Sequence, residues 1–226
     1  MADESHTTDK NVERASRIDT ATLSDALDRL GIAGQCLGIK PLDHRFRMAG
    51  RAFTLSYAPV GHPVGTVGDF VDDVPAGNVV VIDNGGRPDA TVWGDILTYC
   101  AHRRGLGGTV IDGACRDTHL ALELGYPMFS RSYSMRTGKD RVQLEAKQVI
   151  VTIGDARVSP GDILRGDSDG VVVIPRAREG EVLDVAETIE AAEAGIRDAI
   201  AGGMRLDEAR RQQQYHLLQR RETKSS

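Results

Sequence analysis

A strand–helix–strand unit in the middle of the chain constrains the fold more than any other feature of the sequence. The apolar run at 79–82 is followed by a polar turn at 83–86, a helical pattern over 93–104 and a second apolar run at 109–111. Crossover connections of this kind make the two strands parallel, so their carboxyl ends lie at the same edge of the sheet. The unit predicts an α/β fold in which the residues that follow each strand lie close together.

Helical spacing of apolar residues predicts two further helices around this unit. The first spans 18–30, with Asp19 or Thr20 as its N-cap. The second is long and spans 179–200, where an apolar residue recurs every three or four positions. The inward face of the middle helix is expected to carry Ile96, Leu97, Cys100 and Ala101.

The remaining chain predicts short strands and polar ends. Three apolar or alternating runs indicate strands, at 51–57, 148–153 and 171–174. Residues 1–14 and 222–226 are polar and are expected to fray. The segment 204–221 is strongly charged and has a helical pattern. One domain with a C-terminal extension is the simplest arrangement.

The composition excludes several classes of function. The 226 residues suffice for one hydrophobic core, and 40% hydrophobic with 27% charged residues is ordinary for a globular protein. A net charge of −5 and only 4% aromatic residues argue against a nucleic-acid partner. No apolar run approaches the roughly 20 residues of a membrane helix, and the first residues lack a signal-peptide pattern. With three cysteines and no CxxC pair, we expect a cytoplasmic protein without a membrane partner.

Polar residues that packing does not require follow the two strands of the central unit. Gly94–Leu97 opens the central helix, where free backbone N–H groups favour an anion. Arg116 and Asp117 follow the second strand, and twenty residues separate Asp95 from Arg116. An arginine there can bind a carboxylate, and an aspartate can hold a hard cation such as Mg²⁺. The sequence predicts a small anion- and cation-binding site at this edge.

Simpler interpretations of these residues stay open. Asp95 alone is a first-turn acid that interacts favourably with the helix dipole. Arg116-Asp117 alone is a surface ion pair at a turn. Nearby, His119 fits a surface histidine as well as a site residue, and Cys115 fits a small buried residue better than a reactive thiol.

The sequence has an aspartate, Asp95, separated by twenty residues from the pair Arg116-Asp117. This pattern resembles the signature of a known enzyme family. It is similar to the motif of class II 4-hydroxy-4-methyl-2-oxoglutarate (HMG) and 4-carboxy-4-hydroxy-2-oxoadipate aldolases, in which an Asp or Glu is separated by twenty residues from an Arg-Asp pair. These belong to the RraA-like family, named for a regulator of ribonuclease E activity. The resemblance runs from about 18 to 201 and includes the segments 22–27, 80–86, 107–113, 160–162 and 166–175.

The resemblance implies an architecture and an assembly. The fold would be an αββα sandwich resembling the swivelling phosphohistidine domain, with a C-terminal helical extension. The catalytic domain would span 15–203 and the extension 204–226. The family also implies a homotrimer or a homohexamer whose sites lie between subunits.

The resemblance also implies roles for individual residues. The amides of Gly94–Leu97 would bind the pyruvate carboxylate, and Arg116 the keto oxygen. Asp117 would ligate Mg²⁺, Mn²⁺ or another divalent metal, and Asp95 would hold a water on that metal. A glutamate from the neighbouring subunit's long helix would complete the site, with Glu193 as the best match and Glu190 as the reserve.

The expected activity is a carbon–carbon lyase acting on a small 2-oxo acid. It would cleave an HMG-like 4-hydroxy-2-oxo acid to pyruvate through an enolate, with oxaloacetate decarboxylation at the same site. The alternatives are a protein-binding regulator of ribonuclease E and a different lyase reaction on a 2-oxo acid. Two segments depart from the family pattern. The segment 61–70 could reshape the pocket, and Arg131 is either a second carboxylate-binding group or a surface arginine.

Overall fold

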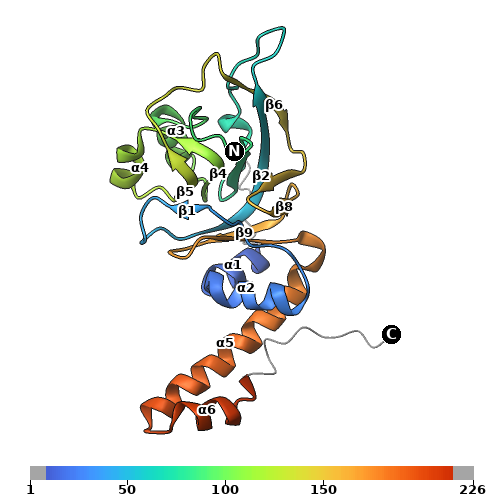
Figure 1. The fold of residues 1–226 in the computed structure, drawn as a ribbon, viewed down its shortest axis with the longest axis vertical. Coiled ribbons are helices and arrows are strands. Elements are labelled where there is room, and N and C mark those ends of the chain that lie inside the picture. Colours follow the sequence, from blue (N-terminus) through green and yellow to red (C-terminus); the bar gives the residue numbers. More distant parts are fainter. Residues whose placement is uncertain (1–8, 216–226) are drawn as a thin grey trace, which may run out of the picture.

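The computed structural model describes residues 9–215 as a mixed α/β fold built on an eight-stranded sheet (Figure 1). The strand order is β1-β5-β4-β3-β2-β9-β10, and β6 pairs with β2 beside this path. The sheet comprises β1 Lys40–Pro41, β2 Met48–Pro59, β3 Val79–Asp83, β4 Gly108–Cys115, β5 Met128–Tyr133, β6 Val142–Lys147, β9 Ile163–Gly166 and β10 Val171–Ile174. A separate antiparallel ribbon pairs β7 Val151–Ile153 with β8 Ala156–Val158.

The central strand–helix–strand unit is confirmed. β3 and β4 run parallel, in register from the pair Val79 and Gly108 to the pair Asp83 and Asp112. Helices α3 (Asp95–Arg103) and α4 (Thr118–Leu124) contribute to the hydrophobic cluster on one face of these strands, and the β7–β8 ribbon contributes to the cluster on the other. Every residue of β4 is buried as a result, which fits its mainly small and apolar side chains; the exceptions are Thr109 and Asp112.

A second helical layer covers the β9–β10 end of the sheet. It consists of α1 (Lys10–Arg17), α2 (Thr20–Arg29) and the first turns of α5 (Glu179–Ala201), whose apolar residues join those of β9 and β10 in one cluster. Asp19 caps α2 by accepting a hydrogen bond from the Thr22 amide at 2.7 Å, as predicted. Two short 3-10 helices are Val71–Asp73 (η1) and Arg176–Arg178 (η2).

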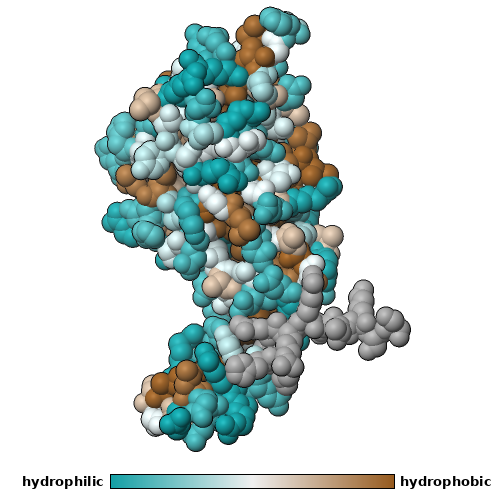
Figure 2. Space-filling model, in the orientation of Figure 1, coloured by the Kyte–Doolittle hydropathy of each residue, from teal (hydrophilic) through white to brown (hydrophobic). Residues whose placement is uncertain are grey.

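The 23-residue α5 extends beyond the sheet and, with α6 (Leu206–Gln212), forms an arm (Figure 1). Hydrophobic surface gathers at the tip of this arm (Figure 2), where Ile200, Met204 and Leu206 are exposed. Across residues 9–215, neither α5 nor any other helix combines the length and hydropathy needed to cross a bilayer. The predicted boundary between 15–203 and 204–226 stays a prediction, and the positions from 216 onward lie outside the described residues.

The expectation that residues 1–14 fray is wrong from Asp9 onward. Asp9 caps α1, accepting hydrogen bonds from the Asn11 and Val12 amides. Arg14 then binds Asp184 at 2.6 Å and Glu187 at 2.7 Å on α5. These ion pairs join residues about 170 positions apart, so local polarity carries no sign of them.

Two further predictions need correction. The strand expected at 148–153 begins only at Val151, because Gln148 adopts a left-handed conformation, with φ of 55°, between β6 and β7. Ile96 was expected on the inward face of the central helix, but its side chain is 80% exposed. The other three predicted residues do face the core: Ala101 is buried, and Leu97 and Cys100 pack against the same cluster. Thr98, which is also buried, was not among the predicted residues.

Candidate active site

The end of β4 and the start of α3 meet at the carboxyl edge of the sheet, as the sequence predicts. The Arg116 amide donates to the Trp93 carbonyl at 3.0 Å, which joins the two segments. Trp93 is itself fixed, since its indole N–H donates to Thr98 Oγ1 at 2.9 Å and its ring stacks on Tyr126. The edge is therefore a rigid platform for the side chains that follow.

Asp95, Arg116 and Asp117 converge on this platform. The Asp95 amide donates to Asp117 Oδ2 at 3.3 Å, and Arg116 Nε lies 3.3 Å from the same oxygen. Asp117 adopts a left-handed conformation, with φ of 53° and ψ of 40°, which aspartate tolerates better than most residues. A Cβ on Gly94 would lie 2.9 Å from Asp117 Oδ2, so a larger residue there would displace the carboxylate from the helix start.

A pocket of about 240 Å³ lies beside this cluster. It is smaller than the roughly 300–1,000 Å³ of sites for drug-sized ligands, so it suits a small acid. Its lining comes from the start of α3, the end of β4 and two loops, and comprises Val67, Gly68, Asp69, Thr91, Val92, Trp93, Gly94, Asp95, Ile96, Leu97, Arg116 and Thr137. All four residues of the predicted Gly94–Leu97 segment line it.

The donor set fits a metal that keeps most of its own water. Among residues 9–215 no three His, Cys, Asp or Glu side chains gather into a metal-binding cluster. Asp95 and Asp117 are the carboxylates at the meeting point of α3 and β4. Mg²⁺ typically takes one or two protein carboxylates and fills its remaining positions with water, whereas structural zinc sites take four protein ligands. The two aspartates therefore suit Mg²⁺ or a similar hard cation.

Other predicted residues lie away from the pocket. Glu193 and Glu190 are on α5, which packs on α1, α2 and α6 rather than on α3. Glu193 accepts a hydrogen bond from the Tyr215 hydroxyl at 3.1 Å. A single chain therefore does not bring either glutamate to Asp95, and only a neighbouring subunit could.

Three neighbouring residues, Arg131, Cys115 and His119, do not line the pocket. Arg131 Nε binds the buried Asp112 carboxylate at 2.6 Å, and Arg131 is absent from the pocket lining. Cys115 is buried, and this burial raises the pKa of its thiol, as expected for a packing residue. His119 lies on α4 outside the pocket lining.

Local sequence motifs do not reveal the loop residues of the pocket, which are Val67–Asp69, Thr91, Val92 and Thr137. Nothing in their local pattern indicates a site, because loops reach the pocket through tertiary contacts. The departure of 61–70 from the family pattern was the one available signal.

Comparisons with known proteins identify relatives of this chain. A family model described as RraA-like, Aldolase/RraA, matches residues 20–173. The chain is 39% identical over 210 residues to protein DlpA of Legionella pneumophila, a match that covers 92% of this chain and 34% of DlpA. It is 33% identical over 184 residues to a Halalkalibacterium halodurans protein named "Putative 4-hydroxy-4-methyl-2-oxoglutarate aldolase", covering 81% of this chain and 85% of that protein. The chain thus spans about one third of DlpA but most of the second relative.

Solved structures give the same picture. An uncharacterized protein from Pseudomonas syringae pv. tomato matches with a TM-score of 0.82 and 42% identity, covering 89% of this chain and 96% of that one. Streptomyces coelicolor RraAS2, described as an unusual member of the RNase ES inhibitor RraA protein family, matches with a TM-score of 0.76 and 29% identity. That match covers 83% of this chain and 96% of RraAS2.

Proposed function

Because this chain belongs to the RraA-like family, whose model covers residues 20–173, we propose that it is a carbon–carbon lyase. The proposed reaction is aldol cleavage of a 4-hydroxy-2-oxo acid, such as HMG, to pyruvate and a second oxo compound. The observation that carries the proposal is that the start of α3, with Asp95, and the Arg116 guanidinium line one small pocket, while the Asp117 carboxylate lies outside the lining and contacts both the Asp95 amide and Arg116. The aldolase name of the Halalkalibacterium halodurans relative supports it.

The start of α3 is the proposed binding site for the pyruvate carboxylate. α3 has nine residues, and its first amides and its dipole favour an anion. The Asp95 and Ile96 amides already hold carboxylate oxygens, of Asp117 at 3.3 Å and of Asp95 at 2.8 Å. These contacts support the view that a substrate carboxylate can be accepted in the same place.

The bond-breaking step needs a base and a positive charge. The C3–C4 bond breaks, and its electron pair stays on the pyruvate half as an enolate. The C4 hydroxyl gives its proton to a base and becomes the carbonyl of the second product, and a proton added at C3 completes pyruvate. Asp95 is the proposed base, since its side chain lines the pocket. Arg116 is the proposed partner of the enolate oxygen.

Asp117 is the proposed ligand of a divalent cation such as Mg²⁺ or Mn²⁺. When bound, such a cation supplies Lewis-acid stabilisation of the negative charge that develops on the keto oxygen. Decarboxylation of oxaloacetate passes through the same pyruvate enolate and needs no base at a hydroxyl. The same residues are therefore proposed to decarboxylate oxaloacetate as a side activity.

A second subunit is proposed to complete the site with Glu193 or Glu190. Both lie on the arm, which extends from the body of the chain (Figure 1) and could reach a neighbour in a trimer or hexamer. In mixed oligomers, Glu193→Gln chains combined with Asp95→Asn chains should regain part of the activity that each variant lacks alone. Full activity of Glu193→Gln would move the assignment to Glu190 or to no partner residue.

The direct test is pyruvate release from HMG and from oxaloacetate, followed with a lactate dehydrogenase coupled assay. We expect turnover with Mg²⁺, loss with EDTA and recovery when Mg²⁺ is added back. No turnover above the background of the metal alone, from a protein with a native circular dichroism spectrum, would contradict the proposal. That outcome would favour a protein-binding regulator, as in the RNase ES inhibitor RraA family to which Streptomyces coelicolor RraAS2 belongs, or a different lyase reaction on a 2-oxo acid.

A further inference from the structure

The pocket holds more negative charge than the pyruvate half of the substrate requires. Asp69 and Asp95 line it, and of residues 9–215 only Arg116 contributes a cationic side chain to the lining. Arg116 already lies beside Asp117, at 3.3 Å. In the proposed reaction Arg116 also serves the keto oxygen, so the lining offers no second cation for a carboxylate elsewhere on the substrate.

Asp69 is held at the pocket by an anchored loop. The Tyr57 hydroxyl donates to the Val67 carbonyl at 2.6 Å, and the following Phe70 is fully buried. Gly68 has φ of 80°, and a Cβ there would lie 2.5 Å from a Leu144 side-chain carbon. The loop therefore packs against β6 in a conformation that favours glycine, and Asp69 follows directly from it.

Asp69 differs from the acids that follow it. Asp72 lies 3.3 Å from Arg104, and Asp73 lies 2.7 Å from Lys147. Within residues 9–215 no hydrogen bond or ion pair engages the Asp69 carboxylate. A carboxylate in a pocket wall that no neighbour engages retains its capacity to accept hydrogen bonds from a ligand.

We propose that Asp69 selects substrates whose distal half, beyond C4, is uncharged and carries hydroxyl groups. This inference rests on the proposed function and narrows its substrate class: HMG, which carries a carboxylate on C4, would be cleaved more slowly than a 4-hydroxy-2-oxo acid whose distal half carries hydroxyl groups. A distal carboxylate meets a like charge at Asp69, whereas a distal hydroxyl can donate a hydrogen bond to it. Thr137, also in the lining, contributes a second hydroxyl-compatible group and no charge.

The test compares three 4-hydroxy-2-oxo acids that share the pyruvate half. Their distal groups are a polyol chain (a 3-deoxy-2-oxo sugar acid), a methyl group (4-hydroxy-2-oxopentanoate) and a carboxylate (4-hydroxy-2-oxoglutarate). We expect kcat/KM for pyruvate release to favour the polyol over the carboxylate by about tenfold or more. Asp69→Asn should reduce this ratio several-fold, chiefly by lowering KM for the carboxylate. Higher salt should reduce it in the wild type, since Asp69 is exposed and its charge is screened.

The matched control is Asp72→Asn, three residues along, whose side chain is 83% exposed and lies outside the pocket lining. It should leave the ratio unchanged. Equal or better turnover of the carboxylate substrate by the wild type would overturn the role of Asp69 and leave the lyase proposal standing. No pyruvate from any of the three acids or from oxaloacetate would overturn both.

Discussion

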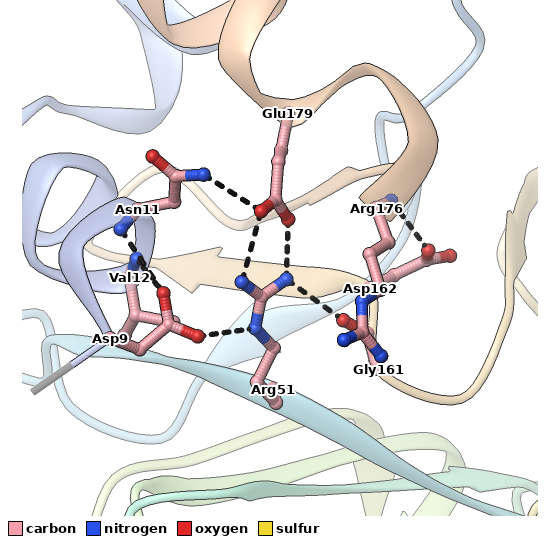
Figure 3. A network of polar contacts seen from close by, with 8 residues as sticks. All are labelled: Asp9, Asn11, Val12, Arg51, Gly161, Asp162, Arg176 and Glu179. Carbon is pink, nitrogen blue, oxygen red and sulfur yellow. Dashed lines mark hydrogen bonds and ion pairs between the residues drawn. The ribbon is translucent and has the colours of Figure 1, made fainter. Parts of the chain in front are cut away.

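Two arginine–carboxylate pairs in this molecule are built in opposite ways. Arg51 on β2 binds both carboxylate oxygens of Glu179 on α5, and its Nε donates to Asp9 at 2.7 Å (Figure 3). The Arg51 and Glu179 side chains are only 18% and 15% exposed. Arg116 and Asp117 make one longer contact of 3.3 Å, and their side chains are 40% and 33% exposed.

The difference lies in how much bonding capacity each pair has left. Arg51 also donates to the Gly161 carbonyl at 3.0 Å, and Asn11 donates to Glu179 at 2.7 Å, so neighbours inside the fold use these groups (Figure 3). Asp117 accepts at one oxygen only among the described residues, and Arg116 faces a pocket. The first pair joins α1, β2 and α5, whereas the second retains capacity for a ligand. Both pairs are charged, so charge alone does not distinguish a structural pair from a ligand-binding one. The number of hydrogen bonds to neighbours in the fold and the degree of burial do distinguish them.

The largest expected effect is loss of activity without loss of stability at Asp117. Asn keeps the left-handed backbone and the size of the side chain but removes the charge. We expect Asp117→Asn to lower kcat/KM for pyruvate release by about 10²–10³ or more, as for removal of one electrostatic group from an active site. Coupled-assay kinetics and a thermal melt measure both quantities on the same preparation.

Asp140→Asn is the matched control, because Asp140 also has a positive φ, of 62°, and lies outside the pocket lining. It should leave both activity and melting temperature close to wild type. If Asp117→Asn instead lowers the melting temperature and retains activity, the comparison is reversed and Asp117 is a structural residue.

The opposite pattern is expected at Arg51. Replacement by Met keeps a long side chain but leaves the Glu179 and Asp9 carboxylates without their shared partner. We expect Arg51→Met to lower the free energy of unfolding by about 2–3 kcal/mol, below the roughly 3–5 kcal/mol of a fully buried pair. Urea unfolding measures this, and kcat/KM of the folded fraction should stay within about twofold, since the pair lies outside the pocket lining. An unchanged midpoint would show that the network adds nothing to stability.

The comparison also separates what could be predicted from the sequence from what could not. The central strands and α3 were predictable, because apolar runs and helical spacing are local signals. Asp95, Arg116 and Asp117 were predictable as a group, because the length of one crossover fixes where the second strand ends. The partners of Arg51 come from Asp9 and Glu179, which are 42 and 128 positions away, so no local pattern indicates them.

Residues on the rim of the site were the hardest to predict. Helical periodicity assigned Ile96 to the core, but α3 is a nine-residue helix whose first turn opens onto the pocket. Ile96 lies in that first turn, lines the pocket and is 80% exposed, so it does not pack in the core. Asp69 reaches the pocket from a loop that packs against β6, and Thr137 reaches it from a loop that pairs with Thr91. Spacing in the sequence contains none of this information.

The smallest expected effect is a dependence of the Arg51 contribution on pH. The Arg51 guanidinium, by direct hydrogen bonds, lowers the pKa of Glu179 below its ordinary 4.5 and that of Asp9 below its ordinary 3.8. As the pH falls through these ordinary values, the unfolded chain takes up protons before the folded one, so the stabilisation present at pH 7 is lost. The difference in unfolding free energy between wild type and Arg51→Met should therefore shrink between pH 6 and pH 3.

The control for this titration is Arg178→Met, which breaks the exposed pair between Arg178 and Glu181 on the same segment of chain. Solvent screens that pair, so its difference from wild type should be close to zero at every pH. A wild-type minus Arg51→Met difference that stays constant down to pH 3 would mean that the two carboxylates are not held ionised by Arg51. The additional hydrogen bonds that distinguish the Arg51 pair from Arg116 and Asp117 would then contribute nothing to the free energy of unfolding. An ion pair that stabilises the fold must lose that contribution when one partner loses its charge.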